Sequence, residues 1–342
     1  MSIFTLGKIR NSLMFRKFLM IFLPVFWGLG VVIAVLYRSE AESDRRLVGL
    51  NESQSIKIQS ELVINDFSLA RADLNILATT NEFKDFLEYK NTNIPLAEIA
   101  KKLIANEYLS LGNQRQSFDV ISFVDINGQE VIRVDFSQYL AVIVPEADLK
   151  NKASYYWFKD ALKLKSGEIF VSPIELDVEQ GRMITPIKPT VRLITPIFDS
   201  EGNKLGLLIL NYRGRKIIDN LVPENSMAIG NLMLINEEGY WLRGRAREDE
   251  WGFMIPERSD RTFARDFPQA WPQIDSHKSG QFFTPEGLFT FETISPQLIV
   301  KGKNISTVND LSNSSDNAIN SLADNLANRD ANDVINTLKN QE

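Results

Sequence analysis

Cysteine is absent from this chain of 342 residues, and histidine occurs once. Without cysteine there can be no disulfides, thiolate nucleophiles or zinc–thiolate sites. The one histidine, His277, lies in the polar segment DSHKSG without an obvious serine–acid partner, which predicts a solvated loop histidine. The sequence also lacks a glycine-rich loop that could cradle a phosphate. We therefore expect no catalysis, no cofactor and no metal centre in this chain.

An excess of basic residues is missing as well. Lys and Arg number 38 against 44 Asp and Glu, which gives a net charge of −6. Because nucleic-acid binding needs concentrated positive charge, we expect no nucleic-acid partner. The hydrophobic content of 44% is that of a globular protein, and the length allows two domains and a tail.

One long run lacks charge altogether. Residues 18–37, FLMIFLPVFWGLGVVIAVLY, are uncharged and mostly bulky and apolar. A helix of this length covers about 30 Å, the hydrocarbon thickness of a bilayer. Four basic residues and no acidic residue precede the run, whereas both signs follow it, so the positive-inside rule places residues 1–17 in the cytoplasm. We predict a transmembrane helix at 18–37 with everything after Tyr37 outside the cytoplasm.

A cleaved signal peptide is the alternative, since Ser39-Glu40-Ala41 offers a small-x-small cleavage site. The apolar run is longer than the roughly 7 to 15 residues of a signal h-region, which favours the membrane span. No second run of spanning length follows, so we predict a single-pass protein.

Helical periodicity follows the span. From Leu47 to Tyr89 the chain has one glycine, no proline and apolar residues mostly at three- or four-residue steps. This pattern predicts a long helix leaving the membrane. The segment ATTNEF should interrupt it, with a new N-cap at Thr80 or Asn81, and a second helix is expected from Pro95 to Leu109.

An Asx-x-x-Gly turn between apolar strands then occurs three times, at 125–128, 199–202 and 236–239. The Asp or Asn and the glycine supply turn chemistry, the glycine taking a positive φ, so we predict three β-hairpins. A further helix is expected at 262–271 and a strand pair at 280–294.

These elements predict an α+β fold: one N-terminal transmembrane helix, a long helix, and two tandem PAS-like modules, each an antiparallel sheet with helices on it. The exported region would span 38–296, with a membrane-distal module at about 95–215 and a membrane-proximal module at about 225–296. The polar, asparagine-rich residues 297–342 are predicted to be a tail or linker.

Four aromatic residues occupy consecutive positions 155–158 in the segment NKASYYWFKDA. A helix that rests on a core needs one apolar stripe, so at least one of these rings must leave the core. Trp157 and Phe158 could enclose a ligand, Tyr155 could donate a hydrogen bond, and Lys152 could supply a cation. The alternative is that the rings are core and the lysines solvated.

Two other groups of charged residues are candidates for the same site. Arg133 shares a strand face with Asp135, so it could meet a ligand carboxylate, although an ion pair with Asp135 is favoured. In the segment ELDVE, Glu175, Asp177 and Glu179 share a face if the chain is extended. They could contact a ligand or form a solvated surface.

The segments YYWFKDALKLKSGEIFVSPIELDVEQG and VRLITPIFDSEGNKLGLLILNYRG resemble double Cache (tandem PDC) sensor domains. Such domains are the extracytoplasmic parts of bacterial chemoreceptors, histidine kinases and diguanylate cyclases. The resemblance covers about residues 40–296 and is strongest at 151–215. It implies a bacterial inner-membrane protein with a periplasmic sensor domain and a ligand pocket between the distal sheet and the aromatic helix.

Amino-acid-binding members of this family often have an Arg-x-Trp-Tyr-x-x-Ala pattern on that helix and an aspartate on a late strand. The match places Trp157 and Phe158 on the aromatic pair, Tyr155 on the arginine and Asn211 on the aspartate, while Asp177 lies near another family ligand residue. With both charged clamps replaced, simple α-amino acids should bind weakly. The predicted ligand-binding residues are Arg133, Lys152, Tyr155, Trp157, Phe158, Ser172, Asp177 and Asn211.

The resemblance implies small-molecule sensing in bacterial signal transduction, with membrane and ligand as partners and a homodimer through the long helix. The sequence contains no Gly-Gly-Asp-Glu-Phe stretch and no kinase phospho-acceptor histidine on a dimerising helix, so the output module is expected to be absent from this chain. Two alternatives stay open. The chain could be a truncated or frameshifted product of a diguanylate cyclase or histidine kinase gene, or a non-catalytic module that regulates a partner through residues 296–342.

Overall fold

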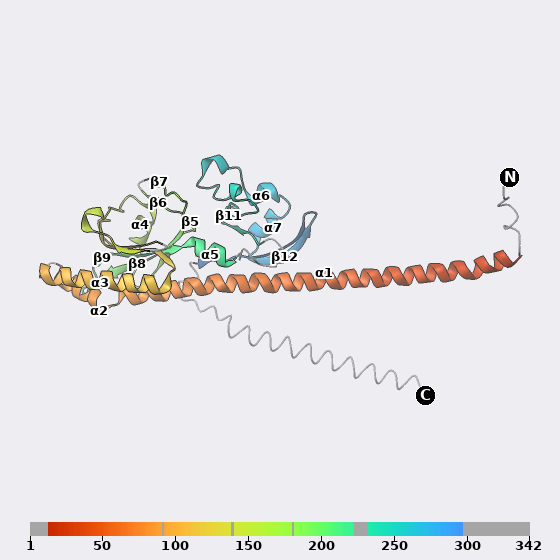
Figure 1. The fold of residues 1–342 in the computed structure, drawn as a ribbon, viewed down its shortest axis with the longest axis horizontal. Helices are drawn as coiled ribbons and strands as arrows, with labels where there is room; N and C mark the ends of the chain where they lie inside the picture. The colour runs from red at the N-terminus through yellow and green to blue at the C-terminus, as the bar shows by residue number, and fades with distance from the viewer. Residues whose placement is uncertain (1–12, 91, 138–139, 180, 222–231, 297–342) are drawn as a thin grey trace, which may run out of the picture. The chain divides into compact units, whose positions relative to one another are not determined.

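The computed structural model describes residues 13–90, 92–137, 140–179, 181–221 and 232–296 (Figure 1). These residues form two compact units. The smaller unit comprises 13–60 and 263–293, and the larger comprises 61–221, 232–262 and 294–296 apart from the undescribed positions. The predicted tail at 297–342 and the start of the predicted proximal module, 225–231, lie outside the described residues. The boundary between distal and proximal modules stays a prediction.

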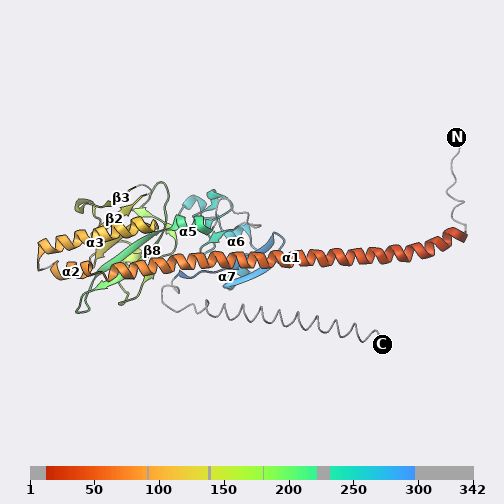
Figure 2. The same ribbon diagram turned by 60° about the horizontal axis from the view of Figure 1, so that its bottom comes forward.

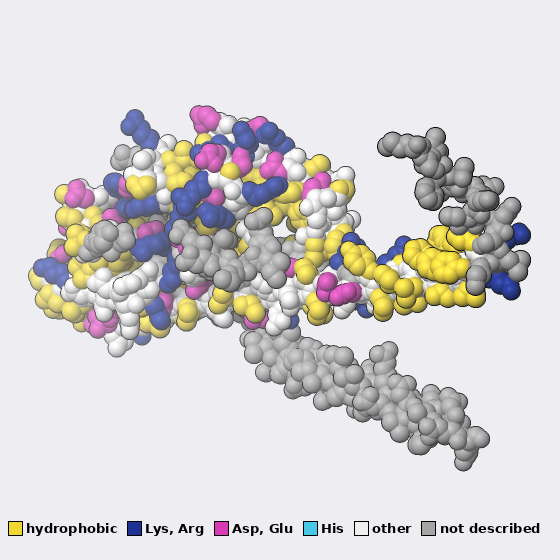
Figure 3. Space-filling model, turned by 45° about the vertical axis from the view of Figure 1, so that its right-hand side comes forward, with side chains coloured by type: hydrophobic (Ala, Val, Ile, Leu, Met, Phe, Trp, Pro, Cys, Tyr) yellow, Lys and Arg dark blue, Asp and Glu magenta, His cyan; other side chains and the backbone are white. Residues whose placement is uncertain are grey.

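Helix α1 (Leu13–Ala78) contains the predicted span. It is the one described helix that is long and apolar enough to cross a membrane, with a mean hydropathy of 2.6 in its most apolar window. Its large apolar side chains from Phe18 to Tyr37 are exposed, and Figure 3 shows them as a continuous hydrophobic surface on this part of the helix. An apolar helix surface of this length and exposure is what a bilayer would cover.

The predicted helix break is confirmed at Thr80. The hydroxyl of Thr80 accepts a hydrogen bond from the Phe83 backbone N–H and caps α2 (Asn81–Tyr89). Helix α3 (Ile94–Arg115) begins one residue before the predicted start and continues past Leu109 to Gln116, which ends it with a φ of 53°. The predicted end was too early because no glycine or proline marks the true end.

The larger unit is built on a seven-stranded antiparallel sheet with the order β3-β2-β1-β9-β8-β4, in which β5 also pairs with β8. This confirms the predicted α+β class. The strands are β1 (Phe118–Asp125), β2 (Glu130–Phe136), β3 (Ala141–Ile143), β4 (Phe170–Val171), β5 (Glu175–Leu176), β8 (Pro189–Phe198) and β9 (Lys204–Arg213). A separate short hairpin joins β6 (Val178–Glu179) to β7 (Arg182–Met183).

All three predicted Asx-x-x-Gly turns are confirmed. The side chains of Asp125, Asp199 and Asn236 each accept hydrogen bonds from two backbone N–H groups of their own turn. The fourth residue of each turn is a glycine with a φ between 81° and 85°. The turns join β1 to β2, β8 to β9, and β10 (Leu234–Ile235) to β11 (Trp241–Arg243).

The two faces of the seven-stranded sheet are covered differently. Helix α3, together with α2 and the end of α1, lies on one face, and helix α4 (Tyr156–Ala161) lies on the other (Figures 1 and 2). The helical layer packs against alternate residues such as Phe123, Val134 and Leu210 in the main core. The opposite face, which we call the α4 face, has a smaller apolar cluster around Trp157 and Phe158.

The remaining elements are short. Helix α5 (Gly214–Leu221) follows β9, and the described residues include 3-10 turns at Glu146–Asp148, Arg247–Asp249 and Pro256–Arg258. The predicted helix at 262–271 is instead two helices, α6 (Phe263–Asp266) and α7 (Trp271–Ser276), because Pro268 cannot continue the first. The predicted strand pair is confirmed as β12 (Ser279–Thr284) and β13 (Gly287–Glu292), which form an antiparallel hairpin in the smaller unit.

Candidate functional site

Helix α4 places its aromatic side chains on different sides. Trp157 and Phe158 are buried against sheet residues of the α4 face, including Ile194 and Ile209. Tyr156 is the ring that leaves the core: it is 47% exposed, and its hydroxyl donates to Glu175 Oε2 over 2.9 Å. The expectation that one of four consecutive rings must leave the core is therefore confirmed. That Trp157 or Phe158 meets a ligand stays a prediction.

Polar residues cross the α4 face in a row from β2 to β8. Arg133 on β2 pairs with Ser122 on β1, and Asn211 on β9 pairs with Arg192 on β8. Val120 on β1 faces Asn211, so Ser122 and Asn211 are diagonal neighbours across the β1–β9 pair. Two of the predicted residues, Arg133 and Asn211, thus share one face with a second arginine that the sequence analysis did not select.

Arg192 is the functional candidate that sequence analysis missed. It is 5% exposed, and its guanidinium carbon lies 5.7 Å from the centroid of the Trp157 ring, within cation–π range. One terminal nitrogen contacts Glu175, and the other donates to Asp177 Oδ1 over 2.6 Å. The signal in the sequence was a single charged residue within the otherwise uncharged strand PTVRLITPIF.

Ser172 lies next to Arg192 but is already bonded. Its hydroxyl accepts from the backbone N–H of Arg192 over 2.9 Å and donates to the carbonyl of Pro173 over 2.8 Å. The side chain is buried. These contacts fix the chain after β4 against β8, so they give Ser172 a structural role, while its predicted ligand contact stays a prediction.

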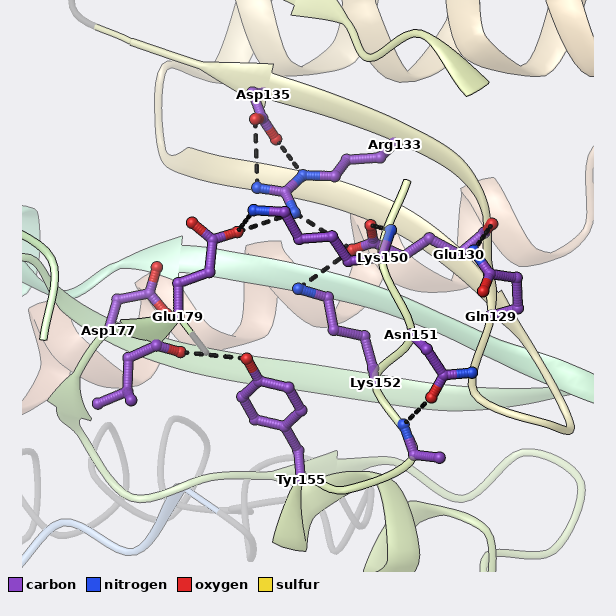
Figure 4. Close-up of polar contacts among 12 residues, drawn as sticks. Gln129, Glu130, Arg133, Asp135, Lys150, Asn151, Lys152, Tyr155, Asp177 and Glu179 are labelled. Carbon is purple, nitrogen blue, oxygen red and sulfur yellow. Dashed lines mark hydrogen bonds and ion pairs between the residues drawn. The ribbon is translucent and has the colours of Figure 1, made fainter. Parts of the chain in front are cut away.

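A second charged group surrounds Glu130, which is buried at the start of β2 (Figure 4). Its carboxylate accepts from the Lys150 backbone N–H over 2.9 Å and forms ion pairs with Arg133 at 3.3 Å and Lys152 at 3.4 Å. The favoured pairing of Arg133 with Asp135 is confirmed, with 2.6 Å between Nε and Oδ1. Glu130 thereby ties the segment that leads into α4 to the edge of the sheet.

Lys152 and Tyr155 lie together in Figure 4. The Lys152 ammonium is 5.4 Å from the centroid of the Tyr155 ring, and the Tyr155 hydroxyl is 3.5 Å from the carbonyl of Val178. Burial lowers the pKa of Lys152, although the nearby Glu130 carboxylate opposes this change. The alternative that the lysines are solvated is therefore wrong for Lys152.

The three carboxylates of ELDVE all reach cations of the α4 face. Glu175 and Asp177 bind Arg192, while Glu179 forms ion pairs with Lys150 at 2.7 Å and with Arg133 at 3.5 Å. Their shared orientation was expected, and it is confirmed. The alternative of a purely solvated surface is wrong, because each carboxylate has at least one cationic partner.

One buried polar atom on this face has no partner. Trp157 is only 4% exposed, and its indole nitrogen Nε1 has no hydrogen-bond partner among the described residues. A buried donor without an acceptor costs about 1–3 kcal/mol, so each such group in a native protein calls for an explanation, of which a bound partner is one. This atom lies where the sequence predicted a ligand.

The other chemical candidates do not form a site. His277 is exposed at the end of α7, where its Nδ1 is 2.9 Å from the Ser276 hydroxyl, as expected for a solvated histidine. Within the described part of the chain, no group of three or more His, Cys, Asp and Glu residues is placed to hold a metal ion.

Comparison with known proteins identifies the family and supports the fold. Residues 70–308 match the family model described as bacterial histidine kinase, sensor domain. No curated protein matches the chain. Among solved structures, a domain of a sensory box/GGDEF family protein from Vibrio parahaemolyticus has 21% identity and a TM-score of 0.64, covering 72% of this chain and 91% of its own.

Two further structures show the range of similarity. The extracellular domain of vpHK1S-Z8 has 21% identity and a TM-score of 0.60, covering 72% of this chain and 90% of its own. The ligand-binding domain of the Campylobacter jejuni chemoreceptor Tlp3, solved with 4-methylisoleucine, has 14% identity and a TM-score of 0.40, covering 57% and 68%. The first two similarities show the fold.

The matched family consists of sensor domains and not of catalytic domains. The expected resemblance to extracytoplasmic sensor domains is therefore confirmed. Since the family model covers more than half of the 342 residues, the chain belongs to the bacterial histidine kinase sensor domain family.

Proposed function

We propose that this protein senses a small molecule outside the cytoplasm, and that the ligand binds on the α4 face between helix α4 and strands β8 and β9. The observation that carries the proposal is the buried indole N–H of Trp157, which has no hydrogen-bond partner among the described residues and belongs to the ring that lies beside the guanidinium of Arg192. A small-molecule site typically combines an apolar enclosure with a few directed polar groups. Trp157, Phe158 and the aliphatic residues of β8 and β9 supply the enclosure.

The ligand should not be a simple α-amino acid. Tyr155 occupies the position where amino-acid-binding relatives have an arginine, and a neutral phenol cannot form the charge-assisted, bidentate bond that an arginine gives a carboxylate. Asn211 in place of an aspartate has no negative charge to attract an α-ammonium group. Both replacements support a ligand that is recognised differently.

The sensor domain is expected in the periplasm of a bacterium, with residues 1–17 in the cytoplasm. The basic residues before the span and the mixed charges after it support this orientation. Helix α1 continues without a break from the span to Ala78 in the unit that contains the α4 face. A ligand that prefers one conformation of this unit would shift the population of conformations of α1.

A parallel homodimer through α1 would let such a shift reach the membrane. Leu62, Leu69 and Ile76 are 45%, 52% and 57% exposed, and they follow one another at intervals of seven residues. A seven-residue repeat of apolar side chains is typical of a helix that pairs with a second helix. A second copy in the same membrane would have its α1 helix parallel to the first.

Ligand binding can be tested by thermal unfolding of the full chain in lipid nanodiscs, screened with organic acids, amino acids, amines and nucleobases. At a hundredfold excess over Kd, a one-site ligand stabilises by about 2.7 kcal/mol, several degrees of Tm for a domain of this size. A screen without a hit at millimolar concentration would contradict ligand sensing.

Any hit should depend on the Trp157 indole nitrogen. Trp157→Phe retains an aromatic ring but removes the donor, and we expect a loss of affinity of about two- to tenfold, since a hydrogen bond contributes about 0.5–1.5 kcal/mol. Trp271→Phe is the matched control, because Trp271 belongs to the smaller unit. Equal affinity in both variants would place the ligand elsewhere.

A further inference from the structure

The segment Glu175–Glu179 crosses the edge of the α4 face, and we call it the strap. It is joined to the start of β8 by the pairs Glu175–Thr190 and Leu176–Pro189 and by the hydrogen bond from the Asp177 N–H to the Lys188 carbonyl. Alternate residues of an extended chain point to the same side. The strap therefore directs its three carboxylates together at the cations of the α4 face.

The strap carboxylates form ion pairs with the cationic groups of the candidate site. Arg192 contacts both Glu175 and Asp177, so its two terminal nitrogens are divided between two carboxylates. A guanidinium can hold a single carboxylate through two parallel hydrogen bonds, which is the stronger and more specific arrangement. A single external carboxylate could therefore replace both strap carboxylates at Arg192.

The charge balance links such a replacement to movement of the strap. Four cations lie on this face, namely Arg133, Lys150, Lys152 and Arg192, and they contact five carboxylates, namely Glu130, Asp135, Glu175, Asp177 and Glu179. An anionic ligand added to this group would increase the excess of negative charge. Release of a strap carboxylate into water would restore the balance and avoid the cost of an unpaired buried charge.

A neutral ligand would have the opposite effect. If it displaced Glu175 or Asp177, the almost fully buried Arg192 would lose its counter-charge, which is strongly unfavourable. If it left them in place, it would have no access to the guanidinium. Only a ligand with its own anionic group keeps Arg192 paired while it frees the strap, and a carboxylate matches the groups that Arg192 already contacts.

We propose that Arg192 is the ligand-binding cation of this protein, that Glu175 and Asp177 act as built-in competitors for it, and that the ligand is a carboxylate whose binding releases the strap. This inference rests on the proposed ligand site on the α4 face. An α-ammonium group is not required, because Asn211, directly opposite Arg192, is neutral. Release of the strap would be the first conformational step that reports the bound ligand.

The test uses acetate as a minimal carboxylate and hydrogen exchange as the readout. The full chain in nanodiscs is incubated with several hundred millimolar sodium acetate or with sodium chloride at the same ionic strength, and exchange of backbone amides at 175–179 is followed by mass spectrometry. We expect acetate to increase the exchange rate of the strap severalfold over chloride. Equal rates in the two salts would overturn the proposal.

Variants separate recognition from folding. Arg192→Gln alone would leave two carboxylates without a counter-charge, so it is combined with Glu175→Gln and Asp177→Asn to remove the whole group together. This triple variant should lose the acetate effect. Lys163→Gln, which removes an exposed ion pair with Asp160 on α4, is the control and should retain it. An acetate effect that persists in the triple variant would also overturn the proposal.

The ligand screen distinguishes this inference from the proposed function. We expect the hits to be carboxylates and Asp177→Asn to increase their affinity about tenfold, because one competitor is removed. A hit without a carboxylate that binds the triple variant as well as the wild type would refute the role of Arg192 but leave ligand sensing intact. No hit of any class would count against both.

Discussion

Glu175 and Glu179 are four residues apart, but the pKa values of their carboxyl groups are shifted in opposite directions. Burial raises the pKa of Glu175, and the charge of Arg192 opposes this only in part. Burial also acts to raise the pKa of Glu179, but the hydrogen bond from Lys150 and the nearby charge of Arg133 outweigh it and lower the pKa overall. As the pH falls, Glu175 should therefore lose its charge before Glu179.

This difference predicts opposite contributions to the pH dependence of stability. A carboxyl with a raised pKa is more easily protonated in the folded state, so the contribution of Glu175 favours folding below its unfolded pKa and is lost as the pH rises through its folded pKa. Glu179 stabilises the fold above its unfolded pKa, and this stability is lost as the pH falls through its lowered folded pKa. Thermal unfolding between pH 3 and 7 measures both.

We expect Glu175→Gln to remove the loss of stability that occurs as the pH rises above the ordinary glutamate pKa. Glu179→Gln should remove the loss that occurs as the pH falls below that pKa. Glu248→Gln, at an exposed position without an ion pair to any described residue, is the control. Identical pH profiles of stability for the two strap variants would show that the pKa values of Glu175 and Glu179 are not shifted in opposite directions.

Arg192 shows why sequence analysis found only part of the site. Strand β8 is covered on both faces, so almost all of its residues are buried and the period-two alternation that identifies an inward-facing side chain is absent. Arg133, by contrast, lies on β2, where the burial alternates and its face could be assigned from the sequence. The partners of Arg192 are 15 and 17 residues away, a separation that no local pattern reveals.

At the scale of elements, local chemistry explains what was predictable. The Asx turns and the Thr80 cap depend on hydrogen bonds within four residues, so their residues alone specify them. The length of α3 and the division of 262–271 into two helices depend on packing and on a single proline. Helix ends without a glycine or proline signal are set by the tertiary structure, and the sequence therefore placed the end of α3 too early.

Helix α3 approaches the sheet closely at one glycine. A Cβ atom added to Gly112 would lie 2.1 Å from the Phe136 ring on β2, far inside van der Waals contact. Gly112→Ala should therefore destabilise the protein by about 1–3 kcal/mol, although alanine favours a helix by about 1 kcal/mol over glycine. Urea unfolding measures the change. Ser110→Ala on the exposed side of α3 is the control, and a more stable Gly112→Ala variant would contradict the close approach.

At the scale of the whole molecule, the absence of cysteine makes the proposed dimer easy to test. A single cysteine at Leu69, on the exposed apolar stripe of α1, should form an intermolecular disulfide under mild oxidation in membranes, because paired α1 helices would bring the two sulfur atoms within bonding reach. Ser68→Cys, which is also exposed but points about 100° away around the helix, should crosslink much less. Equal crosslinking at both positions would indicate random collision and not a defined helix pair.

Membrane orientation decides whether the α4 face can sample an external ligand at all. Four basic residues precede the span, so a reporter that is active only in the periplasm should be active when it is fused after Glu342, and a reporter that is active only in the cytoplasm should be silent there. Fusion of the same reporters after Lys17 should give the reverse pattern. Replacing Lys8, Arg10, Arg16 and Lys17 with glutamine should reduce the periplasmic signal, because the charge difference across the span is then lost. A cytoplasmic signal from the wild-type fusion after Glu342 would place the α4 face inside the cell, where an extracytoplasmic ligand could not reach it.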